Sequence, residues 1–396
     1  MSNKIMSLKS RQEYLKANYQ RYRKARKVIR QTIIDEFCRI AKYHRKSAIR
    51  LLNAPLYKKP KARKARGKTY GSDVVYYLKK IWKILDCPCG IRLEPMLPEM
   101  VKVLEKHKEL VIPETVKSKL LTIKSATIDR RLKKEKIKVI RSIHGTTKPG
   151  SLLKKQIPIV LSRWDEVIPG YTELDLVAHC GNSASGEFAF SLNITDLATG
   201  WTEAEPTLGK AEKRVKQGID DIRNRLPFKL LGIDPDNGSE FINWQLFNYC
   251  LDNEIQFTRG RPGKKNDNAH IEEKNWTHIR KIVGYHRIET QEEVDLLRCL
   301  YRGPWRLYEN FFQPVMKLQE KKRIAGQLIR KYDRAKTPYQ RCLESKYVSK
   351  EQKEKLKTIY DTLNPAELKR EIEHLIEQLT RIIRKRKTQR KPLTTK

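Results

Sequence analysis

"GYTELDLVAHC", residues 170–180, decides the fold class, because apolar side chains recur at every second position along much of it. A period of two predicts a β-strand with one buried face. The next segment, "GEFAFSLNITDLATGWTEAEPTL" (186–208), predicts two strands that turn at Ala198-Thr199-Gly200. Helical and strand patterns then alternate, with helices in 209–226, 239–253 and 266–285 and strands in 228–237 and 254–260. This β-β-β-α-β-α-β-α order predicts a mixed sheet covered by helices, within an α+β multidomain chain.

The charge of the chain is unevenly distributed. The whole chain carries a formal charge of +39, with 85 Lys and Arg. Residues 163–285 hold 15 Lys and Arg against 19 Asp and Glu, a net charge of −4, so the rest of the chain carries +43. Basic arms bind polyanions by counterion release, which predicts a nucleic-acid partner. A ribosome-like or membrane-surface binder does not account for the acidic centre.

Several classes of protein are excluded by the composition. The sequence has no apolar run of about 18 residues and no apolar signal core near its N-terminus, so we expect neither a membrane partner nor secretion. The seven cysteines form no CxxC motif, which indicates reduced thiols and no structural zinc. No P-loop is present, so ATP is not implied. We therefore expect a cytoplasmic protein.

The N-terminal region predicts DNA-binding helices. Residues 11–53 read as helix, short turn and basic second helix, a helix-turn-helix pattern whose second helix starts near His44. An ordinary helical hairpin with a solvated basic face is the alternative. We assign a domain to 1–56 and a basic linker to 57–72, which either follows DNA phosphates or is disordered. The basic residues predicted to contact DNA here are Arg45, Lys46 and Arg50 in the domain and Lys61, Arg63, Lys64 and Arg66 in the linker.

Two further helical regions flank the predicted sheet. A second DNA-binding domain is assigned to 73–140, where "KSATIDRRLKK" (124–134) offers Lys124, Arg130 and Arg131. A linker (141–162) leads to the core (163–285). A basic, mostly helical region (286–396) follows the core. Near its end, apolar residues step by 4, 3, 4 and 3, so this helix either pairs subunits or packs on its own domain: Leu368, Ile372, Leu375, Leu379 and Ile382.

Three carboxylates stand where catalytic acids are often found. Asp175 lies inside an apolar strand, Asp236 lies at the end of another strand, and Glu272 lies early on a helix. Three hard oxygen ligands around one cleft suit Mg²⁺ or Mn²⁺, and two such ions can promote phosphoryl transfer. Acids at strand ends also often cap helices or pair with lysines, so the pattern alone leaves both interpretations open.

The segments "ELDLVAHCG", "DNGSEF" and "NDNAHIEEKNW" resemble the catalytic core of retroviral integrases and bacterial insertion-sequence transposases. The resemblance covers roughly 163–285, and a weaker likeness extends to "TTKPGSLLKKQIP" (146–158) and "YENFFQPVMKL" (308–318). It implies a ribonuclease-H-like fold and a D, D, E triad with about 35 residues between the last two acids. Asp236 and Glu272 are separated by 35 residues, so the resemblance implies Asp175, Asp236 and Glu272 as catalytic residues and as ligands of two Mg²⁺ or Mn²⁺ ions. The absence of an HHCC zinc pattern favours the bacterial branch.

The neighbours of the triad receive supporting roles. Asp234 stands where related proteins commonly have His, Ser or Thr; it either supports the site from behind or adds a fourth carboxylate. Asn237 and Asn268 are further supporting candidates, and His270 is interpreted as structural. The basic residues expected to hold DNA beside the metals are Arg261, Lys264, Lys265, Arg280 and Lys281.

The resemblance implies a homo-oligomeric, nucleoid-associated DNA transposase, dimeric or larger. It would bind the terminal inverted repeats of its element, cleave the ends and join the 3′-hydroxyls to target DNA. A structure-specific nuclease on the same fold and a non-catalytic DNA-binding regulator are the alternatives.

Overall fold

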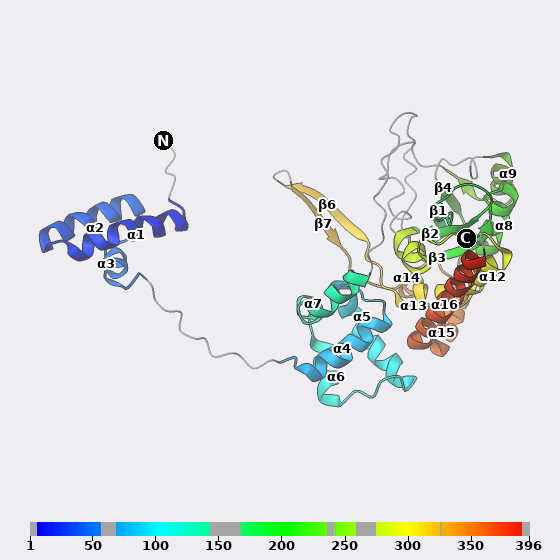
Figure 1. Cartoon of the computed structure of the whole chain (residues 1–396), viewed down its shortest axis with the longest axis horizontal. Coiled ribbons are helices and arrows are strands. Elements are labelled where there is room, and N and C mark those ends of the chain that lie inside the picture. The colour runs from blue at the N-terminus through cyan, green and yellow to red at the C-terminus, as the bar shows by residue number, and fades with distance from the viewer. Residues whose placement is uncertain are drawn as a thin grey trace, which may run out of the picture. The chain divides into compact units, whose positions relative to one another are not determined.

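The chain forms two compact units, Met1–Thr69 and Tyr70–Lys396 (Figure 1). The computed structural model describes residues 6–56, 69–142, 168–235, 241, 243–258, 275–324 and 327–389. The predicted linkers 57–72 and 141–162 lie largely outside these ranges.

The first unit is a three-helix domain. Its helices are α1 (Leu8–Lys24), α2 (Lys27–Ala41) and α3 (Arg45–Asn53). Phe37 and Leu52 are among the buried residues that join the helices in one core. Lys42 ends α2 in the left-handed conformation, and the His44 ring accepts a hydrogen bond from the Lys46 N–H at the start of α3. The predicted start of the second helix near His44 is therefore confirmed.

The second unit is built on a five-stranded mixed sheet. The strands are β1 (Tyr171–Ala178), β2 (Ala189–Asp196), β3 (Thr202–Leu208), β4 (Gly232–Pro235) and β5 (Gln256–Phe257). Their spatial order is β3-β2-β1-β4-β5. The first three strands pair antiparallel, whereas β4 and β5 run parallel to β1. With α8 (Glu212–Arg223) and α9 (Trp244–Asp252), this confirms the predicted mixed sheet covered by helices.

The two faces of the sheet differ in chemistry because side chains alternate along each strand. Leu174, Leu192 and Ile233 point to one face and pack against apolar residues of α8 and α9. Asp175 and Asn193 point to the other face. That face is covered by η1 (Asn275–Arg280, a π-helix), α11 (Lys281–Val283), α12 (Gln291–Leu300), η2 (Tyr301–Trp305) and α13 (Arg306–Phe312).

The helical region before the sheet shares one hydrophobic core with the C-terminal helices. The helices concerned are α4 (Ser72–Ile84), α5 (Gly90–Lys106), α6 (Glu114–Thr122), α7 (Ser125–Ser142), α14 (Pro338–Glu344), α15 (Lys350–Thr362) and α16 (Pro365–Gln389). The Tyr308 hydroxyl donates to the Ile84 carbonyl at 2.6 Å, and Arg370 pairs with Glu109 at 2.6 Å. The regions predicted as 73–140 and 286–396 thus belong to one unit, and α7 runs two residues into the predicted linker.

The last helix packs on its own domain. Leu368, Ile372 and Leu379 are buried in the shared core. Near its end, Arg386 pairs with Glu293 at 2.9 Å. Of the two alternatives for the 4, 3, 4, 3 spacing, packing within the chain accounts for this face.

The prediction of a mostly helical C-terminal region is incomplete, because two strands interrupt it. β6 (Leu318–Ile324) and β7 (Gln327–Tyr332) pair antiparallel. Five Lys and Arg residues between 318 and 332 obscure the strand pattern, since basic residues suit exposed helices equally well. Within the described ranges, no helix has the length and apolar character needed to cross a bilayer.

Candidate active site

Asp175 lies in the middle of β1 and is oriented by contacts from β1 itself and from η1. Its Oδ1 accepts a hydrogen bond from the Leu176 N–H at 2.7 Å. Its Oδ2 accepts from Nδ2 of Asn275, the first residue of η1. The Asn275 Oδ1 in turn accepts from Nδ2 of Asn193 at 2.9 Å. Asn193 is fully buried on β2, directly across from Asp175. The carboxylate is therefore held in one orientation by a chain of two asparagine side chains.

A second acidic position lies on the neighbouring strand. The parallel register of β1 and β4 pairs Glu173 with Asp234 and Leu174 with Pro235. Residues two apart in a strand share a face, so Glu173, Asp175 and Asp234 all point to the side of the sheet that η1 covers. Negative charge is thus concentrated where β1 meets the end of β4.

Many of the predicted site residues lie outside the described residues. These are Asp236, Glu272, Asn237, Asn268, His270, Arg261, Lys264 and Lys265 near the core, and Lys61, Arg63, Lys64 and Arg66 in the basic linker.

The two predicted DNA contacts that follow Glu272 both have partners within the chain. The Arg280 guanidinium donates to the Ala178 carbonyl at 2.7 Å and lies over the Tyr285 ring. Burial lowers the pKa of Arg280. Lys281 pairs with Asp86 in the turn between α4 and α5. These contacts fasten η1 and α11 to their surroundings.

The basic residues of the helical regions that were predicted to contact DNA differ in exposure and in their partners within the chain. Lys124 pairs with Glu94 at 3.2 Å, and Arg130 donates to the Thr127 hydroxyl at 3.4 Å. Arg131 is partly buried. In the first unit, Arg45 contacts Asp35 and Gln31 of α2. Lys46 and Arg50 are both exposed on α3.

A buried, uncharged network lies on the same sheet face as Asp175. The His179 Nε2 and the Ser191 Oγ are 2.7 Å apart, and that oxygen lies 2.8 Å from the Tyr301 hydroxyl. Burial, with a smaller effect from Arg280, lowers the pKa of His179 to about 3. Burial also raises the pKa of Tyr301. The network joins β1 and β2 to η2 without placing a charge beside Asp175 on this face.

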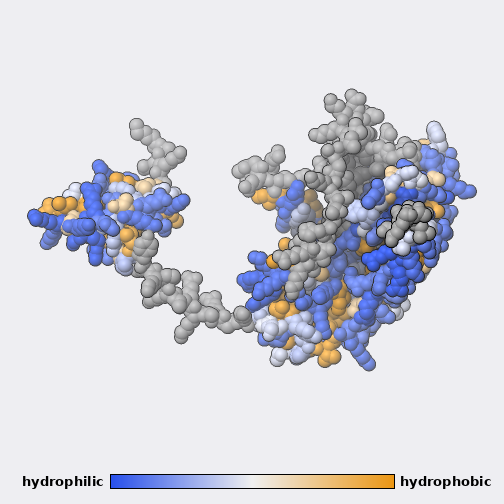
Figure 2. Space-filling view, viewed as in Figure 1, coloured by the Kyte–Doolittle hydropathy of each residue, from blue (hydrophilic) through white to orange (hydrophobic). Residues whose placement is uncertain are grey.

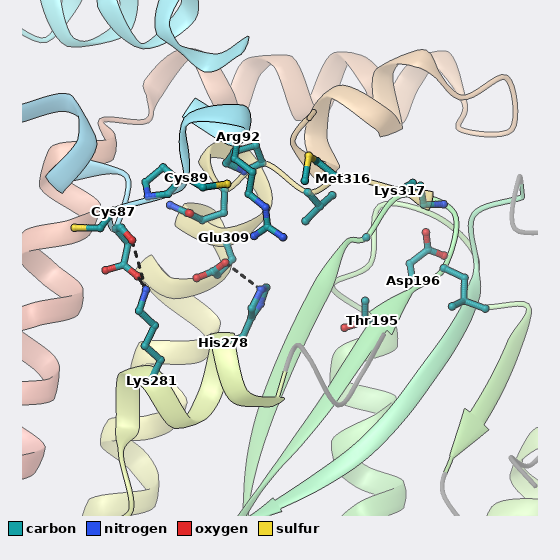
Figure 3. Close-up of a pocket in the computed structure, with 17 residues that line it drawn as sticks. Cys87, Cys89, Arg92, Thr195, Asp196, His278, Lys281, Glu309, Met316 and Lys317 are labelled. Carbon is teal, nitrogen blue, oxygen red and sulfur yellow. Dashed lines mark hydrogen bonds and ion pairs between the residues drawn. The ribbon is translucent and has the colours of Figure 1, made fainter. Parts of the chain in front are cut away.

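A cavity of about 390 Å³ lies at the far end of β2, where the α4–α5 turn meets η1 and α13. Figure 3 shows His278 and Glu309 paired in its lining, with 3.5 Å between Nε2 and Oε2. Asp196 lines its wall, and burial raises the pKa of that carboxyl to about 6 despite hydrogen bonds from Thr199 and Gly170. Asp175 is not among the lining residues, so this cavity is separate from the acidic position.

Sequence reasoning missed the two asparagines that hold Asp175. Asn275 follows Glu272 by three residues, which is one helical turn. Asn193 lies at the buried centre of the second strand pattern. Two signals would have identified them. Asn275 is a polar residue three positions after a catalytic candidate, and Asn193 is a polar residue inside an apolar strand.

No family model matches the chain. A protein of Sinorhizobium fredii (strain NBRC 101917 / NGR234), described as the uncharacterized protein y4rM, is 36% identical over 328 residues. The match spans 83% of this chain and 93% of that protein. The chain belongs to the y4rM family.

Solved structures similar to this y4rM-family chain include retroviral integrase cores. The HTLV-2 integrase catalytic core, in complex with magnesium, is 13% identical, with a TM-score of 0.29 over 38% of this chain and 92% of that one. The BIV integrase core is 17% identical, with a TM-score of 0.30 over 45% and 96%. Because these TM-scores are low, the description of the core's fold rests on the strand order and register given above and not on this likeness.

Proposed function

We propose that this protein is a DNA transposase that cleaves the ends of its element and joins the resulting 3′-hydroxyls to target DNA. Asp175, Asp236 and Glu272 are the proposed catalytic residues. Cleavage would be hydrolysis of one phosphodiester. Joining would be an in-line attack by the freed 3′-hydroxyl on a target phosphodiester, with one P–O bond formed and one broken.

The observation that carries this proposal is that described neighbours of both other acids lie at or next to Asp175. Pro235 lies across from Leu174. Asp236 is bonded to Pro235, and consecutive Cα atoms are about 3.8 Å apart. Asn275 contacts Asp175 directly, and Glu272 precedes Asn275 by three residues, a reach of at most about 11 Å. Chain connectivity therefore allows all three carboxylates to gather on one face of the sheet, beside Asp175 and the end of β4.

The donor set suits divalent cations. Asp175 offers hard carboxylate oxygens at a partly buried position, and Asn275 holds them in place. Mg²⁺ or Mn²⁺, when bound by the three acids, would activate the attacking oxygen and offset charge that develops at phosphorus. The protein's part is to fix the orientation of Asp175 through Asn275 and Asn193. It also keeps the neighbouring His179 neutral.

The charge distribution supports DNA as the substrate. An acidic centre repels a phosphodiester, so the basic remainder of the chain has to supply the attraction. Lys46 and Arg50 on α3 are exposed at the position of the reading helix in a helix-turn-helix. We propose that this unit recognises the ends of the element and that two or more copies synapse a pair of ends.

The test is strand joining with pre-cut element ends and a plasmid target in Mg²⁺. Asp175→Asn, Asp236→Asn and Glu272→Gln should each abolish joining while DNA binding is retained. Asp252→Asn, an exposed acid at the end of α9, is the control and should join normally. Cleavage without joining would support a nuclease instead. DNA binding without any cleavage or joining by the wild-type chain would leave only a DNA-binding regulator, and full joining by the three variants would contradict the assignment of the three acids.

A further inference from the structure

The β6–β7 ribbon is exposed on both of its faces. Ile329 is 50% exposed, on the face that it shares with Lys322. Tyr332 is 46% exposed, on the opposite face with Arg330. Every side chain described between 318 and 332 is exposed. Figure 2 shows hydrophobic and hydrophilic residues side by side on this ribbon. A two-stranded hairpin without a packing partner is only marginally stable. Contacts at its base or with a ligand are therefore needed to keep it folded.

The base of the ribbon is firmly attached. Val315 and Lys336 exchange two backbone hydrogen bonds, of 2.9 and 3.1 Å. Asp333 pairs at 2.7 Å with Arg341 of α14, and Arg341 also donates to the Val315 carbonyl at 3.1 Å. These contacts fix the direction in which the strands leave α13 and return to α14 (Figure 1). Beyond these contacts, none of the strand side chains that the structure describes is buried.

The charge on the ribbon is almost all positive. Between 318 and 332 there are five Lys and Arg and a single acid, Glu320. Glu320 pairs with Lys322 at 2.5 Å. Arg330 and Lys331 have no ion-pair partner within the part of the chain that the structure describes. Charged side chains on exposed edge strands, lysine especially, also prevent edge-to-edge aggregation. That role does not call for the exposed apolar side chains of Ile329 and Tyr332 beside the charges. The mostly positive charge next to exposed apolar side chains indicates a polyanionic partner.

We propose that the β6–β7 ribbon is a binding arm for duplex DNA, separate from the α3 helix and from the acidic site. The major groove of B-DNA admits a two-stranded β-ribbon. Strands of six or seven residues reach about 20 Å, enough to lie along a groove and meet phosphates on both sides. The exposed Ile329 and Tyr332 supply apolar contacts to bases or sugars. The inference rests on the proposed action of the protein on DNA.

The first test is the salt dependence of duplex binding by the full chain. Lys322→Gln, Arg330→Gln and Lys331→Gln are combined in one variant. The matched control removes three exposed lysines from α15: Lys350→Gln, Lys355→Gln and Lys357→Gln. Each lost phosphate contact should lower the slope of log K against log [salt] by about 0.9, so the ribbon variant should lose up to about 2.7. The control variant has the same net charge as the ribbon variant and should keep the wild-type slope. Equal slopes in the two variants would overturn the proposal.

The second test locates the contact. A photo-crosslinking amino acid replaces Ile329 in the ribbon or, as the control, Ile359 in α15, which is 41% exposed. Adducts with duplex DNA should form from position 329 and not from 359. Preferential competition by single-stranded RNA or by an acidic protein would overturn the assignment to duplex DNA. If the ribbon crosslinks to DNA but the wild-type chain joins no ends, the proposed function fails and the ribbon inference stands. If the chain joins ends but no adducts form from the ribbon, the proposed function stands and the ribbon inference fails.

Discussion

Asn275 donates a hydrogen bond to Asp175 across 100 positions of sequence, and this contact connects the helix after Glu272 to the central strand of the sheet. Asn193 extends the contact to β2. Since an acid that binds a metal needs a fixed orientation, the two asparagines give the proposed site its geometry. They also make that geometry testable without changing any of the three acids.

Asn275→Ala should lower strand joining by about tenfold to a hundredfold, because partners that orient a metal ligand typically contribute that much. The loss should be accompanied by a higher Mg²⁺ requirement, since Asp175 would no longer be held by the Asn275 amide. Joining is measured over a Mg²⁺ titration. Asn182→Ala, in an exposed loop, is the control. A loss of activity with an unchanged Mg²⁺ titration and a lower melting temperature would indicate a purely structural role for Asn275.

Glu203→Gln should destabilise the second unit by about 3 kcal/mol. Glu203 is fully buried and accepts from the Trp201 indole at 3.0 Å. It also pairs with Arg225 at 3.3 Å and with Arg306 at 2.9 Å, and these arginines would lose its charge. Urea unfolding followed by tryptophan fluorescence measures the effect. Glu351→Gln breaks an exposed pair with Lys355 that water screens, so it should leave the unfolding midpoint almost unchanged. Equal shifts in the two variants would contradict the prediction.

The sheet was predictable from sequence because its strands alternate regularly and its turns carry recognisable signals. Asp175 was predictable for the same reason, as a lone acid in an apolar strand. The β6–β7 ribbon was not, because neither of its faces is buried and so no apolar periodicity marks it. The partners of Arg280 and Lys281 were not predictable either. They depend on Ala178 and Asp86, which tertiary packing alone brings near η1 and α11.

Acid should destabilise the protein through His179. The folded state lowers its pKa to about 3, against about 6.5 in an unfolded chain. The unfolded state therefore binds a proton that the folded state excludes, and stability falls as the pH drops below 6.5. At pH 5 the loss is about 2 kcal/mol. The glutamine in His179→Gln does not titrate. The difference in free energy of unfolding between wild type and variant should therefore narrow by that amount between pH 7.5 and pH 5.

Urea midpoints at the two pH values measure the effect of His179. The matched control is His374→Gln, on the exposed surface of α16. A gap between wild type and His179→Gln that is the same at both pH values would contradict the assignment of a neutral, buried imidazole.

Asp234→Asn should retain joining within about tenfold of wild type, whereas Asp236→Asn should abolish it. The register of β1 and β4 sets Asp234 across from Glu173, two positions before Asp175 along β1. Pro235 lies across from Leu174, and Asp236 is the next residue in the sequence. A supporting role for Asp234 also predicts that its variant needs more Mg²⁺ without losing the maximal rate. Joining measured at saturating Mg²⁺ separates the two aspartates. If Asp234→Asn is inactive there and Asp236→Asn is active, the two roles are reversed.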